Sequence, residues 1–176
     1  MKLLDDNILL YAYNKGSVEH ERARSWLEEA LAGPAPVAFC WPTLLAFLRI
    51  TTNPRALSRP LQIAQARAII DSLLAVPIAT LVLPTERHWE ILARLLTAGQ
   101  AIGPLVSDAH LAALAIEHGA TLITNDRDFA RFPDLRVEYP LLDLQARVRR
   151  ESIAAIAGAG EQEPDPATRT LAPWQG

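Results

Sequence analysis

The stretch SDAHLAALAIEHGATLITNDRDFARF, residues 107–132, decides the fold. Ser107 is favourable at a helix start and Gly119 at a helix end, so a helix is predicted between them. Residues 121–124 then form a short run of β-branched and apolar residues, typical of a buried parallel strand. Asp126 follows that strand closely. The stretch therefore predicts a helix, a strand and an acid just beyond the end of the strand.

The start of the chain repeats the order of strand and acid. Leu3-Leu4 predict a short first strand, and the helix-starting residues Asp5-Asp6-Asn7 lead into a buried helix. Strands and helices alternate along the rest of the chain, which predicts an α/β fold with a parallel sheet covered on both faces. The further predicted strands are 37–40, 80–83 and 136–138, and the further predicted helices are 17–31, 42–50, 61–75 and one from residue 84.

Composition narrows the class of protein. Half of the 176 residues are hydrophobic, which excludes a disordered chain, and the net charge of −3 gives no global basic surface for nucleic acid. Cys40 is the only cysteine, so no intramolecular disulfide can form. There is no secretory signal pattern and no apolar run long enough to span a bilayer. We expect a cytoplasmic protein without a membrane partner.

The composition changes after Leu142. Residues 1–142 carry the strand and helix patterns and are predicted to form one domain. Residues 143–176 are predicted to be a C-terminal extension, with a possible helix over 143–157. The remainder, 158–176, is rich in Gly, Pro and polar residues and predicts a flexible tail.

Three acids are expected to meet at one end of the sheet. Asp5 and Asp126 follow strands, and Asp108 opens a helix. Ligands of open α/β sheets bind beyond the carboxyl ends of the strands, and gathered carboxylates suit Mg²⁺ or Mn²⁺. Each acid alone has a plain structural explanation, as a helix cap, a helix-start residue or a turn residue. Their related positions together favour a metal site.

The sequence also resembles a known family. The motifs MKLLDDNILLYAY, WPTLLAFLRITTNPR and SDAHLAALAIEHGATLITNDRDFARF resemble those of PIN-domain ribonucleases, specifically VapC-type toxins of bacterial toxin–antitoxin modules. The resemblance covers residues 1 to about 142. It implies a three-layer α/β/α PIN-like domain with a central parallel sheet of about five strands. It also implies an endoribonuclease toxin that uses Mg²⁺ or Mn²⁺, cleaves RNA, forms a homodimer and is inhibited by a small VapB-like antitoxin.

The resemblance assigns roles to individual residues. It maps the catalytic, metal-binding acids onto Asp5, Asp108 and Asp126, and supporting roles onto Asn7 and Thr124. Asn7 and Thr124 are equally explained as a local cap and a strand residue.

One position departs from the family pattern. The family usually places a glutamate near residues 44–47, where this chain has Leu44, Leu45, Ala46 and Phe47. Asp128 and Asp6 adjoin the proposed ligands and are candidates to compensate, although neither is a like-for-like replacement.

Basic residues near the acids are candidate RNA contacts. They are Arg49, Arg127 and Arg131, which are equally explained as solvated surface residues. His110 lies two residues after Asp108 and, on a helix, points away from it, so a packed or partner-facing role is expected rather than a catalytic one.

Two other functions are compatible with the same residues. The missing glutamate favours a catalytically weakened PIN domain that binds RNA or a protein. The spacing Asp126-Arg127-Asp128 also suits a small phosphate-ester hydrolase with paired acids. Cleavage of a structured RNA in a divalent-metal titration separates the nuclease from the binding module. Activity on a small phosphate ester without activity on RNA favours the hydrolase.

Overall fold

The structure is a computed structural model that describes residues 1–142. Met1–Leu142 form one compact unit. The helix predicted over 143–157 and the tail predicted over 158–176 lie outside the described residues. Within residues 1–142, no helix combines the length and the apolar character needed to cross a lipid bilayer.

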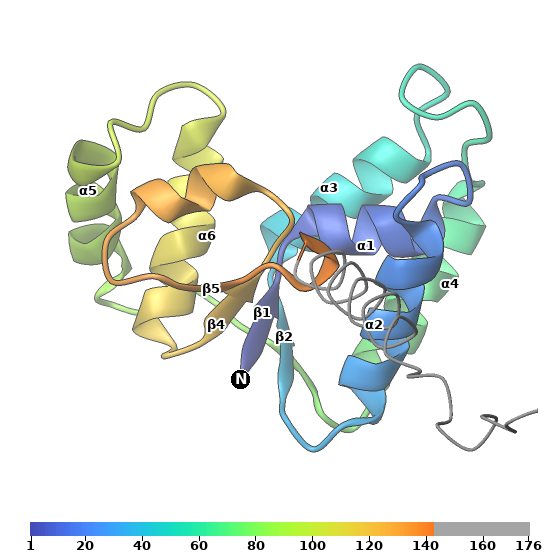
Figure 1. Ribbon diagram of the computed structural model, residues 1–176, viewed down its shortest axis with the longest axis horizontal. Coiled ribbons are helices and arrows are strands. Elements are labelled where there is room, and N and C mark those ends of the chain that lie inside the picture. The colour runs from blue at the N-terminus through green and yellow to red at the C-terminus, as the bar shows by residue number, and fades with distance from the viewer. Residues whose placement is uncertain (143–176) are drawn as a thin grey trace, which may run out of the picture. The chain divides into compact units, whose positions relative to one another are not determined.

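A five-stranded sheet, entirely parallel, forms the centre of the unit (Figure 1). Its strands lie in the order β3-β2-β1-β4-β5. The predicted parallel sheet of about five strands is therefore confirmed. The strands are β1 (Lys2–Leu4), β2 (Val37–Phe39), β3 (Ala79–Leu81), β4 (Thr121–Ile123) and β5 (Arg136–Glu138).

The strand order reverses between β1 and β4. From β1 the chain adds β2 and β3 on one side, and it then returns to add β4 and β5 on the other. Leu4 pairs with Ile123 at the carboxyl end of the two strands, and the backbone N–H of Asp5 donates to the Ile123 carbonyl at 3.0 Å. Such a reversal opens a crevice beyond the strand ends, the usual ligand position in open α/β sheets.

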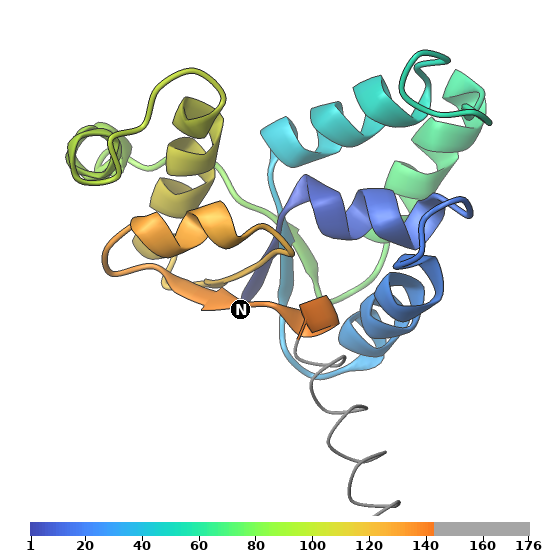
Figure 2. The same ribbon diagram turned by 45° about the horizontal axis from the view of Figure 1, so that its top comes forward.

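Helices cover both faces of the sheet (Figures 1 and 2). Alternate strand residues point to opposite faces: Leu4 and Ile123 join the core beneath α1 to α4, whereas Leu3 and Leu122 join the core beneath α5 and α6. This confirms the three-layer α/β/α class. The helices are α1 (Asp6–Tyr13), α2 (His20–Ala32), α3 (Trp41–Thr51), α4 (Ile63–Leu74), α5 (His88–Ala98) and α6 (Leu105–Glu117), with a 3₁₀ helix η1 (Arg127–Arg131) after β4.

Several predicted helix starts differ from the structure. Helix α6 begins at Leu105 after Pro104, so Ser107 lies within the first turn and does not cap it. Proline has the backbone angle of a helix already fixed, which favours this earlier start. Helix α2 starts after Ser17, whose hydroxyl instead accepts from the Glu19 N–H in a turn. The predicted end of α6 is confirmed, because Gly119 adopts the left-handed φ of +60°.

Candidate active site

Asp5 lies at the reversal point and is the most constrained acid of the site. It follows β1, is 7% exposed and caps α1, because one carboxylate oxygen accepts from the Asp6 N–H at 2.7 Å. Its other carboxylate oxygen accepts from Asn7 Nδ2 and from the Thr124 hydroxyl, both at 2.7 Å. Three donors from two strand ends therefore hold this carboxylate in place.

Thr124 and Asn7 connect the end of β1 to the end of β4. The fully buried Thr124 hydroxyl donates to Asp5 and accepts from Asn7 Nδ2 at 2.9 Å and from the Asp126 N–H at 3.0 Å. Asn7 Oδ1 accepts from the Asn125 N–H at 3.1 Å. The supporting positions predicted for Thr124 and Asn7 are thus both within hydrogen-bond distance of the proposed ligand Asp5.

Asp126 is placed by the same network. Its N–H is held by Thr124, and its carboxylate caps η1 by accepting from the Asp128 N–H at 2.8 Å. One Asp126 carboxylate oxygen therefore has a structural role, which agrees with the explanation of Asp126 as a turn residue. The Asp126 N–H also donates to the Thr124 hydroxyl, which in turn binds Asp5.

Asp108, in the first turn of α6, lines one pocket together with Asp5. The pocket has a volume of about 300 Å³, and its walls come from the end of β1, the start of α1, α3 and the N-terminal half of α6. Three of its lining residues are acids: Asp5, Asp6 and Asp108. Asp126 does not line this pocket, although its charge acts on Asp108.

The crowded carboxylates perturb one another. Burial raises the pKa of Asp5 to about 7, against the opposing effect of the Thr124 hydrogen bond. Burial also raises the pKa of Asp108 to about 6, with further contributions from the negative charges of Asp126, Asp128 and Asp6. Acids that are buried together in this way favour either a proton or a cation.

The donor set suits a hard divalent cation. The side chains offered are carboxylates, which Mg²⁺ and Mn²⁺ prefer. Within residues 1–142, no three His, Cys, Asp or Glu side chains are grouped closely enough to hold one ion together. A cation here would therefore take one or two carboxylates directly and keep water in its remaining positions, which is the habit of Mg²⁺ in proteins.

The three predicted RNA-contact arginines differ in their surroundings. Arg49 on α3 lines the acid pocket. Arg131 is engaged, with Nη2 at 3.3 Å from Asp128 and Nη1 donating to the Gly99 carbonyl at 3.4 Å. Arg127 lies exposed at the start of η1. Arg49 is the one of the three that lines the same pocket as the acids.

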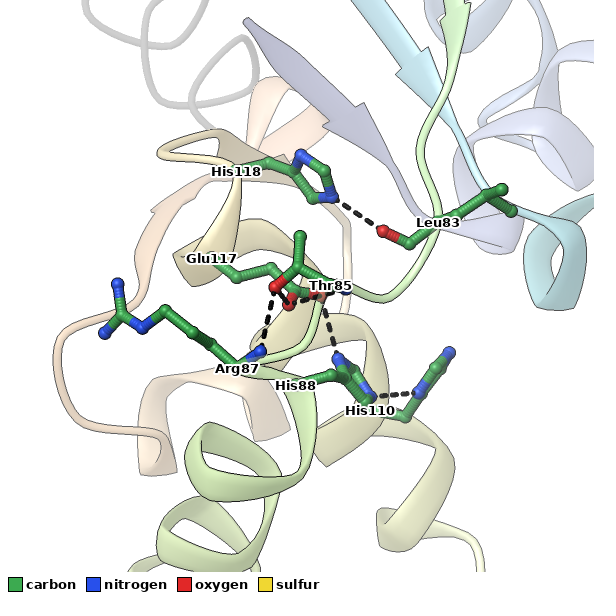
Figure 3. Close-up of polar contacts among 7 residues, drawn as sticks. All are labelled: Leu83, Thr85, Arg87, His88, His110, Glu117 and His118. Atoms are coloured by element: carbon green, nitrogen blue, oxygen red, sulfur yellow. Dashed lines mark hydrogen bonds and ion pairs between the residues drawn. The ribbon is translucent and has the colours of Figure 1, made fainter.

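His110 contacts His88, the first residue of α5 (Figure 3), and it does not line the acid pocket. Its Nδ1 lies 2.8 Å from His88 Nε2, and His88 Nδ1 lies 2.8 Å from a carboxylate oxygen of Glu117, whose side chain is 1% exposed. The second Glu117 oxygen accepts from the Thr85 hydroxyl at 2.6 Å. The packed role expected for His110 agrees with this chain of contacts. Sequence reasoning missed His88 and Glu117, because 29 positions separate the partners.

The family follows from comparison with known proteins. The sequence pattern of the PIN domain matches residues 2–135. The chain belongs to the PIN-domain family.

Its relatives include ribonucleases of the VapC type. Ribonuclease VapC37 of Mycobacterium tuberculosis is 46% identical over 140 residues, which cover 80% of this chain and 97% of the relative. Ribonuclease VapC33 of the same species is 38% identical over 141 residues, covering 80% of this chain and 99% of the relative.

Solved structures share the fold at lower identity. One is VapBC2 from Rickettsia felis bound to a DNA fragment from its promoter, with a TM-score of 0.58 and 24% identity. The match covers 78% of this chain and 96% of that chain.

We predict that Glu117→Gln lowers the free energy of unfolding by about 1–3 kcal/mol, because the amide leaves one of the buried donors without an acceptor. Urea unfolding at neutral pH measures the change. Glu28→Gln is the matched control, since Glu28 pairs with Arg24 at the exposed surface and is expected to cost less than about 0.5 kcal/mol. Equal losses in the two variants would contradict the structural role of Glu117.

We predict that Asp108→Asn stabilises the metal-free protein at pH 8. The pKa of Asp108 is raised to about 6 in the folded state, so its favourable contribution is complete below pH 4 and is lost as the pH rises through 6. The gain at pH 8 is at most about 1 kcal/mol, because solvent screens this partly exposed group. Thermal unfolding in EDTA at pH 4 and pH 8 tests this, and a gain that is equal at both values contradicts it.

Proposed function

We propose that this chain is a metal-dependent endoribonuclease, the toxin of a toxin–antitoxin pair, which hydrolyses RNA phosphodiester bonds with Mg²⁺ or Mn²⁺. The observation that carries the proposal is the arrangement of Asp5, Asp108 and Asp126 around the strand reversal. The ribonucleases VapC37 and VapC33 support the reaction class. Residues 1–142 would form the nuclease domain, in agreement with the compact unit Met1–Leu142.

Each acid has a distinct task in this proposal. Asp5 and Asp108 offer carboxylates from two different elements to the same pocket, and the negative charge of Asp126 acts on Asp108. Thr124 and Asn7 fix the orientation of Asp5, so that its position does not depend on the ligand. When bound, the divalent cation offsets charge on the phosphate and lowers the pKa of water at the site.

The arginines would position the RNA. Arg49 lines the same pocket as the acids, so its guanidinium can approach a phosphate that lies over them. Arg127, which is exposed, and Arg131, which is partly exposed, lie on η1. They would contact phosphates further along the RNA. Positive charge beside the acids lets an acidic protein bind a polyanion locally, although the chain carries a net charge of −3.

The partners proposed are the RNA substrate, a small VapB-like antitoxin and a second copy of the chain. The resemblance to VapC-type toxins supports the antitoxin and the homodimer. A cytoplasmic location is part of the proposal, because the RNA substrates of such a toxin are found there.

The small phosphate-ester hydrolase is disfavoured by the surroundings of Asp128. Its side chain is 59% exposed and pairs with Arg131, so Asp126 and Asp128 do not form a buried pair of acids. Cleavage of a structured RNA at saturating Mn²⁺ separates the nuclease from the weakened binding module. Hydrolysis of p-nitrophenyl phosphate without cleavage of RNA would favour the phosphate-ester hydrolase.

We predict that Asp5→Asn and Asp126→Asn each reduce the rate of RNA cleavage by at least about 100-fold. Mutation of a residue that only supports a metal ligand commonly lowers metal affinity or activity by about 10- to 100-fold, so loss of a ligand should cost at least as much. Cleavage rates at saturating Mg²⁺ and Mn²⁺ measure the effect, and circular dichroism checks the fold. Full activity of either variant would remove that acid from the mechanism.

We predict that Arg49→Gln weakens RNA binding without weakening metal binding. Loss of one phosphate contact should reduce the slope of log affinity against log salt by about 1. Binding is measured in an Asp126→Asn background, so that the RNA stays intact. Arg67→Gln is the control, because Arg67 pairs with Asp71 on α4, away from the pocket lining. A salt slope equal to that of the control contradicts the phosphate contact.

A further inference from the structure

A second pocket lies at the C-terminal ends of α1 and α3, and we call it the distal pocket. Its volume is about 490 Å³, which is in the usual range for ligand sites. One wall comes from the end of α1 and the turn after it, and the other from the end of α3 and the loop that leads to α4. The lining residues are Tyr13, Asn14, Lys15, Gly16, Thr51, Leu57, Ser58, Arg59 and Leu61.

The charge of the distal pocket is positive. Its lining includes two cations, Lys15 and Arg59, and no acid. Both residues are exposed, and neither forms an ion pair within residues 1–142. The acid pocket has the opposite balance, because three acids and one arginine line it. The distal pocket therefore suits an anionic ligand, although the chain carries a net charge of −3.

Backbone contacts shape both walls of the distal pocket. On one wall, the Asn14 side chain accepts from the Gly16 N–H at 3.0 Å, and the Asn14 carbonyl accepts from the Ser17 N–H at 2.9 Å. On the other wall, the Leu61 N–H donates to the Thr51 carbonyl at 2.7 Å, which closes the loop after α3. The cavity is therefore formed before any ligand binds, as ligand sites usually are.

The acid pocket and the distal pocket lie along the same pair of helices. Strands β1 and β2 are parallel neighbours that each lead into a helix, and α1 and α3 pack side by side (Figures 1 and 2). Asp6, in the first turn of α1, lines the acid pocket, and Tyr13, on the same face at the end of α1, lines the distal pocket. These two positions are separated by about 10 Å along the helix axis. One short single strand of RNA can therefore reach both pockets.

The residues at the C-terminal end of α3 extend the positive charge between the two pockets. Arg49 lines the acid pocket, and Thr51, in the same turn of α3, lines the distal pocket. Proteins that bind single-stranded nucleic acid combine a positively charged groove for the phosphates with apolar surface for the bases. Tyr13 and Leu57, both partly exposed, provide such apolar surface in the distal pocket.

We propose that the distal pocket binds a nucleotide of the RNA substrate that flanks the scissile bond, with Lys15 and Arg59 contacting its phosphates. The inference rests on the proposed function, which makes RNA the substrate. The acid pocket then receives the scissile phosphate, and the distal pocket holds the same strand a short distance away. Full affinity therefore requires an RNA long enough to occupy both pockets.

The test is the affinity of the full chain for fluorescein-labelled single-stranded RNAs, measured by fluorescence anisotropy in an Asp126→Asn background that keeps the RNA intact. The RNAs have about 3 and about 10 nucleotides, so that only the longer one spans both pockets. Lys15→Gln/Arg59→Gln should weaken binding of the longer RNA by about 10-fold and reduce the slope of log affinity against log salt by about 1.4, because each phosphate contact of a single strand contributes about 0.7. Affinity for the shorter RNA should change less than about threefold, because each contact acts only on the phosphates that reach it.

Two further variants separate the pocket from general charge. Arg67→Gln/Arg87→Gln is the matched control, because it removes the same charge from exposed positions that line neither pocket. It should leave the affinity for both RNAs close to that of the wild type. Ser58→Trp fills the distal pocket without a change of charge and should weaken binding of the longer RNA alone.

Equal losses in the two double variants overturn the inference, because they would reflect the net charge of the protein. A lower melting temperature of Lys15→Gln/Arg59→Gln with wild-type RNA affinity also overturns it, because the two cations would then only stabilise the helix ends. Binding of AMP as tightly as the longer RNA would mark a separate small-molecule site and would contradict it as well. In each of these cases, RNA cleavage by the wild type leaves the proposed function standing. A wild-type protein that neither binds nor cleaves RNA at saturating Mn²⁺ overturns both.

Discussion

The hydrogen bond from the Thr124 hydroxyl to Asp5 is the contact on which the site depends. It joins the residue after β4 to the residue after β1, at the place where the strand order reverses. Both groups are buried, so breaking this contact would leave a polar group without its partner in the interior. The same hydroxyl accepts from the Asp126 N–H, so one side chain fixes the positions of two acids.

This rigid arrangement accumulates negative charge. Asp5, Asp6 and Asp108 share one pocket, and burial raises the pKa of each carboxyl. A folded protein tolerates such repulsion when a ligand offsets it, and a divalent cation does so most directly. Arg49 adds a single positive charge from α3, which suits a site that must also receive a phosphate.

Much of this arrangement was predictable from the sequence, because short apolar runs followed by acids specify both parallel strands and their carboxyl ends. The alternation of strands and helices followed from that pattern, and the grouping of Thr124 with Asp5 was implied by the family resemblance. The strand order, with its reversal between β1 and β4, was not predicted. Helix starts were less predictable, because Pro104 rather than Ser107 begins α6. The contacts of Glu117 were not predictable, because they link residues far apart in the chain through tertiary packing.

The central claim is tested most directly by a crystal structure of the full chain with Mn²⁺. The anomalous scattering of the metal locates the ion. The account predicts an anomalous peak in the pocket lined by Asp5, Asp6 and Asp108, within about 2–2.6 Å of at least one of these carboxylates. A fully occupied Mn²⁺ elsewhere on the protein, with no peak in this pocket, would contradict it.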